Sequence, residues 1–271
     1  MNFERLEARY VVPEMKRVFS LGDVNGLPRD IGPYRDMIVL HGETTSGTEG
    51  WSAIDTTKFP VYGSESTIEA WALLSEIGSN LLGKDLQSPR EAVKSLGFLI
   101  DHSIFQAAFA NLYLDTEANY KNVPLYTLLG GEKNAVEVGI SISKDESLDR
   151  IDEIISKEKF RRVKIKVGPN QEDLDKIADV RKNNPEIMLM IDANSSFDLR
   201  NAEHERLLME YGNLNLLMIE QPLAHNDISN HIKLQKKFNV NRVPGKICLD
   251  ESILSADDAR RAFYEDGRQI V

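Results

Sequence analysis

Met190-Ile-Asp-Ala-Asn194 is the first of three short segments in which a carboxylate follows an apolar run. The other two are Met218-Ile-Glu-Gln-Pro222 and Cys248-Leu-Asp-Glu-Ser252. Asp192 and Glu220 are 28 positions apart, and Glu220 and Asp250 are 30 apart, which is about the length of one strand plus one helix. Three successive βα units would therefore bring the three carboxylates to one rim of a parallel sheet.

Lys164-Ile-Lys166 lies one such unit before the first carboxylate. Side chains alternate along a strand, so both lysines would share one face and Ile165 would lie on the other. Two ammonium groups near a divalent cation disfavour each other's protonation, which can lower the pKa of a lysine toward that of a general base. A polar strand end in solvent would have the same composition, so this motif alone decides nothing.

The three carboxylates are hard oxygen ligands of the kind that suits Mg²⁺. Each has another reading, because Asp after a strand often caps the next helix and Glu-Gln-Pro can be an ordinary turn. Three carboxylates in phase, with the lysine pair upstream, favour the metal site. The metal would neutralise a substrate carboxylate and stabilise the charge that develops as its α-proton is removed. Asn194 and Glu251 adjoin the ligands and could orient them, although helix capping suits Asn194 equally well.

Composition limits the class of protein. The net charge of −10 argues against a nucleic acid or an anionic membrane surface as partner. Cys248 is the only cysteine, which excludes an intrachain disulfide and a cysteine-based zinc cluster, and its apolar neighbours favour a buried small residue. Of the five histidines, we place only His225 near the rim, where a surface or loop position is the simpler reading. Because we find neither a signal peptide nor an apolar run of about 18 residues, we expect a soluble cytoplasmic protein.

Residues 1–130 are predicted to form an α+β domain, since short extended patterns precede helical ones. Ser66-Thr-Ile-Glu69 resembles a capping box, and a second helix should include Ile104 to Tyr113. The Gly/Pro-rich stretch from Leu21 to Pro33 indicates a mobile loop between antiparallel strands.

Residues 131–271 show short apolar strands alternating with amphipathic helices. The predicted strands are 136–142, 162–167, 187–191, 214–219 and 246–249, and Arg268–Val271 looks like the start of a sixth. The fold class is therefore α/β, with an N-terminal α+β domain followed by an incomplete TIM-type barrel of about five and a half βα units.

These residues resemble the enolase superfamily, and within it the muconate-lactonising subgroup, which shares the Lys-x-Lys strand. The segments most similar to o-succinylbenzoate synthases and N-acylamino acid racemases are Phe3–Glu7, Gly63–Trp71, Leu125–Gly131, Leu217–Leu223 and Ile247–Ser252. The resemblance implies a capping domain on a modified TIM barrel, with Mg²⁺ held by Asp192, Glu220 and Asp250.

The resemblance also implies roles and a reaction. Lys166 would be the base or acid on one face of a small-molecule carboxylate, and Lys164 would assist it electrostatically or bind that carboxylate. The synthase reaction removes an α-proton and then water, giving o-succinylbenzoate for menaquinone biosynthesis. Racemisation or epimerisation of N-acylamino acids or dipeptides, and cycloisomerisation of diacids, are the alternatives. The segments Leu21–Pro33 and Trp51–Tyr62 would correspond to loops that close over the substrate.

One departure stands out: the family carries a second catalytic lysine at the end of the sixth barrel strand, about where this chain ends at Val271. We therefore expect a fragment or a truncated product with impaired catalysis. A non-catalytic remnant that binds Mg²⁺ or a partner chain is the alternative of another class. The open sheet would expose strand edges and apolar surface, which favours association into a homo-oligomer.

Overall fold

The structure is a computed structural model that describes residues 1–16, 19–24, 27–56, 58, 65–97, 102–158 and 160–264. The chain divides into two compact units. The first consists of Met1–Arg17 and Gly32–Val136, and the second of Val18–Ile31 and Glu137–Val271. The sequence predicted a single boundary after residue 130, whereas this division falls after Val136 and also assigns an early segment to the second unit.

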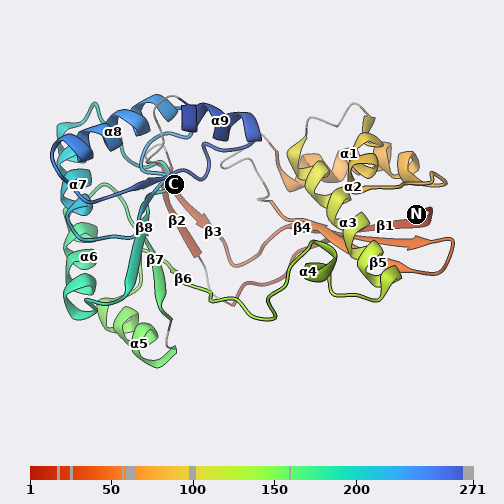
Figure 1. Cartoon of the computed structure of the whole chain (residues 1–271), viewed down its shortest axis with the longest axis horizontal. Helices are drawn as coiled ribbons and strands as arrows, with labels where there is room; N and C mark the ends of the chain where they lie inside the picture. The colour runs from red at the N-terminus through yellow and green to blue at the C-terminus, as the bar shows by residue number, and fades with distance from the viewer. Residues whose placement is uncertain are drawn as a thin grey trace. The chain divides into compact units, whose positions relative to one another are not determined.

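Three antiparallel strands form the sheet of the first unit, in the order β1 (Phe3–Val11), β4 (Met37–Thr44) and β5 (Glu49–Ile54). Along β4 the buried residues Ile38 and Leu40 alternate with less buried ones, as expected where one face of a sheet meets the core. The helices of this unit are α1 (Thr67–Leu81), α2 (Pro89–Lys94), α3 (Ser103–Lys121) and α4 (Leu125–Leu128) (Figure 1). One apolar core joins the sheet to α1, α2 and α3.

The predicted capping box at the start of α1 is confirmed. The Ser66 hydroxyl accepts a hydrogen bond from the Glu69 backbone N–H at 3.3 Å and donates one to Glu69 Oε2 at 2.7 Å. The second predicted helix is also confirmed and extends over the whole of α3. It ends at Asn122, whose left-handed backbone (φ 52°) stops the helix.

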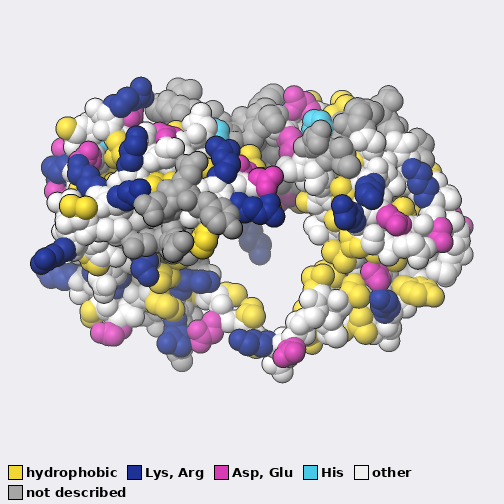
Figure 2. Space-filling view, turned by 45° about the horizontal axis from the view of Figure 1, so that its top comes forward, with side chains coloured by type: hydrophobic (Ala, Val, Ile, Leu, Met, Phe, Trp, Pro, Cys, Tyr) yellow, Lys and Arg dark blue, Asp and Glu magenta, His cyan; other side chains and the backbone are white. Residues whose placement is uncertain are grey.

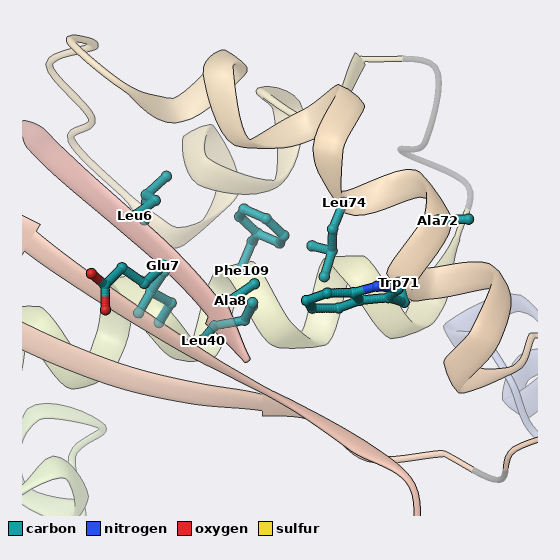
Figure 3. A pocket seen from close by; sticks show the side chains of 9 residues that line it. Leu6, Glu7, Ala8, Leu40, Trp71, Ala72, Leu74 and Phe109 are labelled. Atoms are coloured by element: carbon teal, nitrogen blue, oxygen red, sulfur yellow. The ribbon is translucent and has the colours of Figure 1, made fainter. Parts of the chain in front are cut away.

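An apolar cavity of about 460 Å³ lies between the sheet of the first unit and its helices (Figure 3). Its apolar lining consists of Leu6, Ala8, Leu40, Trp71, Ala72, Leu74, Phe109 and Leu112. Glu7 also lines it, and Figure 3 shows the carboxylate of Glu7 pointing away from the apolar side chains. The sheet and helices of this unit therefore do not fill the space between them completely.

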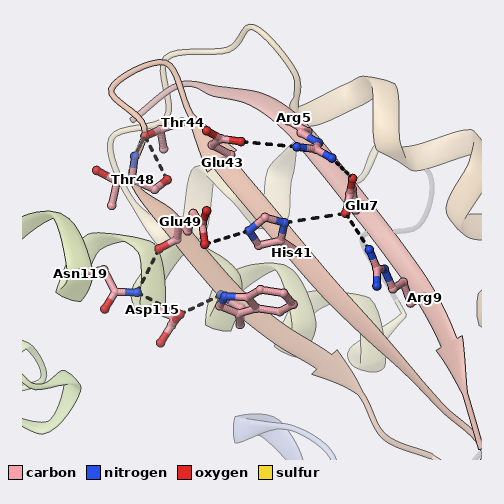
Figure 4. A network of polar contacts seen from close by, with 11 residues as sticks. Arg5, Glu7, Arg9, His41, Glu43, Thr44, Thr48, Glu49, Asp115 and Asn119 are labelled. Carbon is pink, nitrogen blue, oxygen red and sulfur yellow. Dashed lines mark hydrogen bonds and ion pairs between the residues drawn. The ribbon is translucent and has the colours of Figure 1, made fainter.

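The opposite face of the same sheet carries a polar network (Figure 4). The His41 ring stacks on Trp51 with centroids 4.2 Å apart, and it lies 4.0 Å from Glu7 Oε2 and 3.5 Å from Glu49 Oε2. From α3, Asp115 Oδ2 accepts a hydrogen bond from the Trp51 backbone N–H at 2.7 Å. A helix side chain thus satisfies a donor at the edge strand β5, which protects that edge against pairing with other chains.

Five parallel strands form the main sheet of the second unit, ordered β10-β9-β8-β7-β6. Their bounds are β6 (Ile140–Ile142), β7 (Arg162–Lys166), β8 (Met188–Asp192), β9 (Ile219–Glu220) and β10 (Ile247–Cys248). The intervening helices are α5 (Leu148–Glu158), α6 (Gln171–Asn183), α7 (Ala202–Gly212) and α8 (Ile228–Val240), and α9 (Ala256–Tyr264) follows β10. Figure 1 shows α6, α7 and α8 along one side of this sheet. This sheet and the antiparallel one of the first unit confirm the predicted α/β class.

β6 and β9 are several residues shorter than predicted, and β10 covers only Ile247–Cys248 of the predicted 246–249. β6 begins only at Ile140, and the preceding Val136 and Val138 are exposed. β9 begins only at Ile219, because the chain before it turns through Asn215 with a left-handed backbone (φ 51°). Among the described residues, no helix is long and apolar enough to cross a membrane.

The stretch expected to be a mobile loop forms a hairpin instead, with β2 (Phe19–Val24) antiparallel to β3 (Leu27–Ile31). It falls within the second unit. The other predicted covering segment begins in β5, and its residues 57 and 59–62 lie outside the described part of the chain, as does the predicted sixth strand at 268–271.

Arg181 of α6 connects the two turns that lead into β8 and β9. Its guanidinium donates hydrogen bonds of 2.9 to 3.3 Å to the carbonyl oxygens of Asn184, Pro185, Ile187, Leu214 and Asn215. One half-buried cation thereby satisfies carbonyls from two irregular segments that lack a regular ladder.

We expect Arg181→Met to lower the free energy of unfolding by about 2 kcal/mol, because it leaves these carbonyls without a charged donor. Urea denaturation followed by far-UV circular dichroism measures the change. The control is Arg206→Met, which removes an exposed arginine paired with Glu203 and Glu210 and should have a much smaller effect. Equal losses in the two variants would contradict this role for Arg181.

Candidate active site

The carboxyl ends of three neighbouring strands bring the first predicted residues into one row. Lys166 of β7 is in register with Asp192 of β8, and Asp192 is in register with Glu220 of β9. All three residues are buried, although each carries an ionisable group. Buried charges persist in proteins only when they are paired, so the contacts among these side chains decide what the site can do.

Lys164 and Lys166 both reach Asp192, so the prediction that they share a face of the strand is confirmed. Lys164 Nζ lies 2.6 Å from Glu220 Oε1 and 3.3 Å from Asp192 Oδ2. Lys166 Nζ lies 3.2 Å from the same Asp192 oxygen. Two ammonium groups and two carboxylates therefore form one continuous ion-pair network.

The surroundings of Lys164 act on its pKa in opposite directions. Burial acts to lower its pKa, but the hydrogen bond to Glu220 and the charges of Asp192 and Glu220 outweigh burial and raise it. The pKa of Glu220 is also raised, first by burial and then by Asp192 and Asp250, against the effect of Lys164. Neighbouring carboxylates contribute to both shifts, and their surplus negative charge favours any bound cation.

Asn194 and Glu251 extend the network from Lys166. Asn194 Oδ1 accepts a hydrogen bond from Lys166 Nζ, and Asn194 Nδ2 donates one to Glu251 Oε1 at 3.0 Å. Burial raises the pKa of Glu251, and its Oε2 is buried without a hydrogen-bond partner among the described residues. Asn194 thus contacts the lysine directly, and the next helix, α7, is capped by Asn201 rather than by Asn194.

Asp250 follows β10 and is exposed. Its charge contributes to the raised pKa of Glu220, which places it near that carboxylate. As the side chains stand, however, no three His, Cys, Asp or Glu residues in the described part of the chain are arranged to hold a metal ion. Lys164 instead supplies the positive charge between Asp192 and Glu220.

The donor set nevertheless fits a hard divalent cation. All three candidate ligands are carboxylates at the ends of consecutive strands, and the site carries surplus negative charge. Glu220 Oε1 and Asp192 Oδ2 face Lys164 Nζ, so an incoming metal ion would compete with this ammonium group for the carboxylate oxygens.

The structure favours the simpler reading of both remaining candidates, His225 and Cys248, although Cys248 is half-buried rather than fully buried. His225 is exposed in the loop after β9. Cys248 lies in β10 beside Glu220, and burial together with the charges of Glu220 and Asp250 raises the pKa of its thiol to about 11. The thiol is therefore protonated at neutral pH, as expected of a small packing residue rather than a nucleophile.

Sequence reasoning missed two buried residues beside the site, Gln221 and His231. Gln221 directly follows Glu220, and the His231 side chain is held neutral because burial lowers its pKa. The signal was present: His231 falls at a helical spacing among the apolar residues of α8, where a polar side chain must find a partner.

A second cavity, of about 820 Å³, lies at the same end of the sheet among the loops that follow β7, β8 and β9. Its lining includes Pro169, Ser195, Phe197, Arg200 and Leu223. Among the described residues that border it, none belongs to the lysine and carboxylate row, so the two features are separate.

Comparison with known proteins identifies the family. Residues 146–271 match the family model described as "Enolase C-terminal domain-like". The chain is 33% identical to an o-succinylbenzoate synthase from Geobacillus kaustophilus, an alignment that covers 100% of this chain and 69% of that protein. It is 34% identical to an N-succinylamino acid racemase from Thermus thermophilus, over 84% of this chain and 59% of the racemase.

Solved structures share the fold. An enolase superfamily member from Listeria innocua has a TM-score of 0.83 at 24% identity, covering 98% of this chain and 69% of the other. The muconate lactonizing enzyme from Pseudomonas fluorescens, complexed with muconolactone, has a TM-score of 0.84 at 20% identity, covering 98% and 71%. Both structural likenesses are below the identity at which function transfers, but together with the synthase relative they confirm the resemblance seen in the sequence. The chain belongs to the enolase superfamily.

Proposed function

We propose that this chain carries the proton-abstracting and metal-binding part of an o-succinylbenzoate synthase active site. Such an enzyme removes a proton next to a carboxylate and then eliminates water. The observation that supports this most is the row of Lys166, Asp192 and Glu220 at the ends of three neighbouring parallel strands. The synthase relatives at 32 to 35% identity support the choice of reaction. We assign the reaction to menaquinone biosynthesis, as the resemblance implies, and to the cytoplasm, as we expect from the sequence.

The residues have distinct roles in this proposal. Lys166 Nζ takes the α-proton on one face of the substrate, and Asn194 Oδ1 holds that nitrogen in place. Lys164, once released from Glu220, binds the substrate carboxylate or stabilises its charge. Asp192, Glu220 and Asp250 would hold Mg²⁺, with Glu251 supporting them through Asn194. When bound, Mg²⁺ stabilises the negative charge that develops on the carboxylate as the proton leaves.

Racemisation of an N-acylamino acid is the second candidate, and the Thermus thermophilus relative favours it. Proton removal beside the carboxylate is common to both reactions. The two differ in the next step, because a racemase returns a proton to the opposite face and a synthase expels water.

The first prediction concerns the metal. Mg²⁺ or Mn²⁺ at 100 times its dissociation constant should stabilise the folded protein by about 2.7 kcal/mol. We expect Asp192→Asn and Glu220→Gln to lose most of this gain, as measured by thermal denaturation with and without metal. Asp198→Asn, which removes a carboxylate paired with Arg200, is the control and should keep it. No stabilisation of the unaltered protein by either ion would exclude the metal site.

The second prediction concerns the base. In deuterium oxide with metal, the protein should exchange the α-hydrogen of a suitable carboxylate, and Lys166→Ala should lower the exchange rate by about 10² to 10⁴. Proton nuclear magnetic resonance follows the loss of the α-hydrogen signal. Lys157→Ala, which alters an exposed lysine of α5, should exchange at the original rate. Identical rates in all three proteins would favour the non-catalytic, metal-binding reading.

The third prediction separates the two reactions. The substrate of the synthase reaction, a cyclohexadiene carboxylate, should lose water and form the aromatic o-succinylbenzoate. Absorbance detects this product, and a chelator should stop its formation. N-succinylamino acids should then exchange deuterium more slowly than the dehydration proceeds. Rapid exchange of N-succinylamino acids with no dehydration of the diene would identify a racemase instead.

A further inference from the structure

Gln221 occupies a junction of three loops at the carboxyl end of the sheet. Its backbone N–H donates to Cys248 O at 2.8 Å, and its carbonyl accepts from Ser195 N at 2.7 Å. The backbone there is left-handed (φ 38°), which costs a non-glycine residue free energy and persists only where its surroundings enforce it. The residue is fully buried, so its side-chain amide must also be satisfied within the protein.

The side-chain amide uses all of its hydrogen-bonding capacity. Gln221 Oε1 accepts from the backbone N–H groups of Asp250 at 2.9 Å and Ser252 at 3.2 Å. Gln221 Nε2 donates to Ser252 Oγ at 2.7 Å and to Leu223 O at 3.1 Å. Because two backbone donors face one atom, that atom must be the oxygen, and the orientation of the amide is fixed.

His231 of α8 supports this orientation. Its Nε2 accepts from the Leu223 backbone N–H at 3.1 Å and lies 3.4 Å from Gln221 Nε2. Its Nδ1 donates to Asp227 O at 2.8 Å. The imidazole therefore carries its proton on Nδ1 and presents an acceptor toward the glutamine.

The sheet alone holds the turn from Asp250 to Ser252 only weakly. β9 and β10 pair over two residues each, Ile219 with Ile247 and Glu220 with Cys248. Two hydrogen bonds to Gln221 then hold the segment that carries Asp250 and Glu251 beside the end of β9. The Gln221 side chain thus fixes the position of the backbone that carries Asp250, the third candidate ligand.

We propose that Gln221 is a positioning residue that sets the distance between the carboxylates of Glu220 and Asp250 and so controls the metal affinity of the site. This inference rests on the proposed function, because it takes both carboxylates as metal ligands. It assigns no chemical step to Gln221. Outer contacts of this kind typically change metal affinity or activity 10- to 100-fold when they are removed.

Gln221→Met tests the proposal, because it keeps the length of the side chain and removes all its hydrogen bonds. Gln235→Met is the matched control. Gln235 is likewise buried and also holds β10, accepting from Ile247 N at 2.8 Å and donating to Gly245 O at 3.2 Å, but it does so at the end of the strand away from the carboxylates. Both variants should lose stability, and circular dichroism melts establish a temperature at which both are folded.

The readout is the dissociation constant of Mn²⁺ at that temperature, measured by calorimetry. We expect Gln221→Met to raise it about 10- to 100-fold and Gln235→Met to change it little. Equal affinities in Gln221→Met and the unaltered protein, or equal losses in the two methionine variants, would overturn the proposal.

Amide hydrogen exchange separates this inference from the metal assignment. Without metal, Gln221→Met should speed exchange of the Asp250 and Ser252 amides, whereas Gln235→Met should speed exchange of Ile247. If the unaltered protein binds no Mn²⁺, the proposed metal site fails, and the exchange rates then decide the positioning role alone. Unchanged exchange at Asp250 and Ser252 in Gln221→Met would refute that role.

Discussion

The site depends on the need to neutralise carboxylates that a parallel sheet brings together at its carboxyl edge. In-register pairing of β7, β8 and β9 leaves no freedom to separate Lys166, Asp192 and Glu220. Burying them unpaired would cost several kcal/mol for each ion. The two lysines supply the neutralising charge. Asn194 accepts a hydrogen bond from Lys166, and Gln221 holds the loop that carries Asp250.

The same balance explains why the site favours a cation. Carboxylates remain in excess after both lysines are counted, and their charge contributes to the raised pKa values of Glu220 and Lys164. Lys164 then acts as an internal counter-ion between Asp192 and Glu220. A divalent ion bound to these carboxylates would take over their neutralisation, and the Lys164 ammonium group could then contact the substrate.

The sequence was sufficient for the fold class and for the lysine and carboxylate row, because both depend on periodicity. A period of two puts Lys164 and Lys166 on one face, and a strand plus a helix brings Asp192 and Glu220 to one edge. The sequence was insufficient to predict where the short strands begin and which side chains contact one another. Residues 214–219 are apolar enough for a strand, but the left-handed Asn215 and the carbonyls bound by Arg181 end that possibility, and neither depends on local pattern. The state of Lys164 could not be predicted either, because it depends on which oxygens surround its ammonium group.

The assignment of β2 and β3 to the second unit has a consequence for how this chain is made and divided. The chain leaves the first unit after β1, builds a hairpin in the second, and returns to pair β4 with β1. Neither unit is therefore a continuous piece of sequence, and a cut at residue 136 would separate the hairpin from the sheet of its own unit. During synthesis the hairpin emerges about 100 residues before the parallel sheet. It therefore cannot pack within its unit until the strands of that sheet have also been made. The order of segments along the chain therefore does not follow the division into the two units.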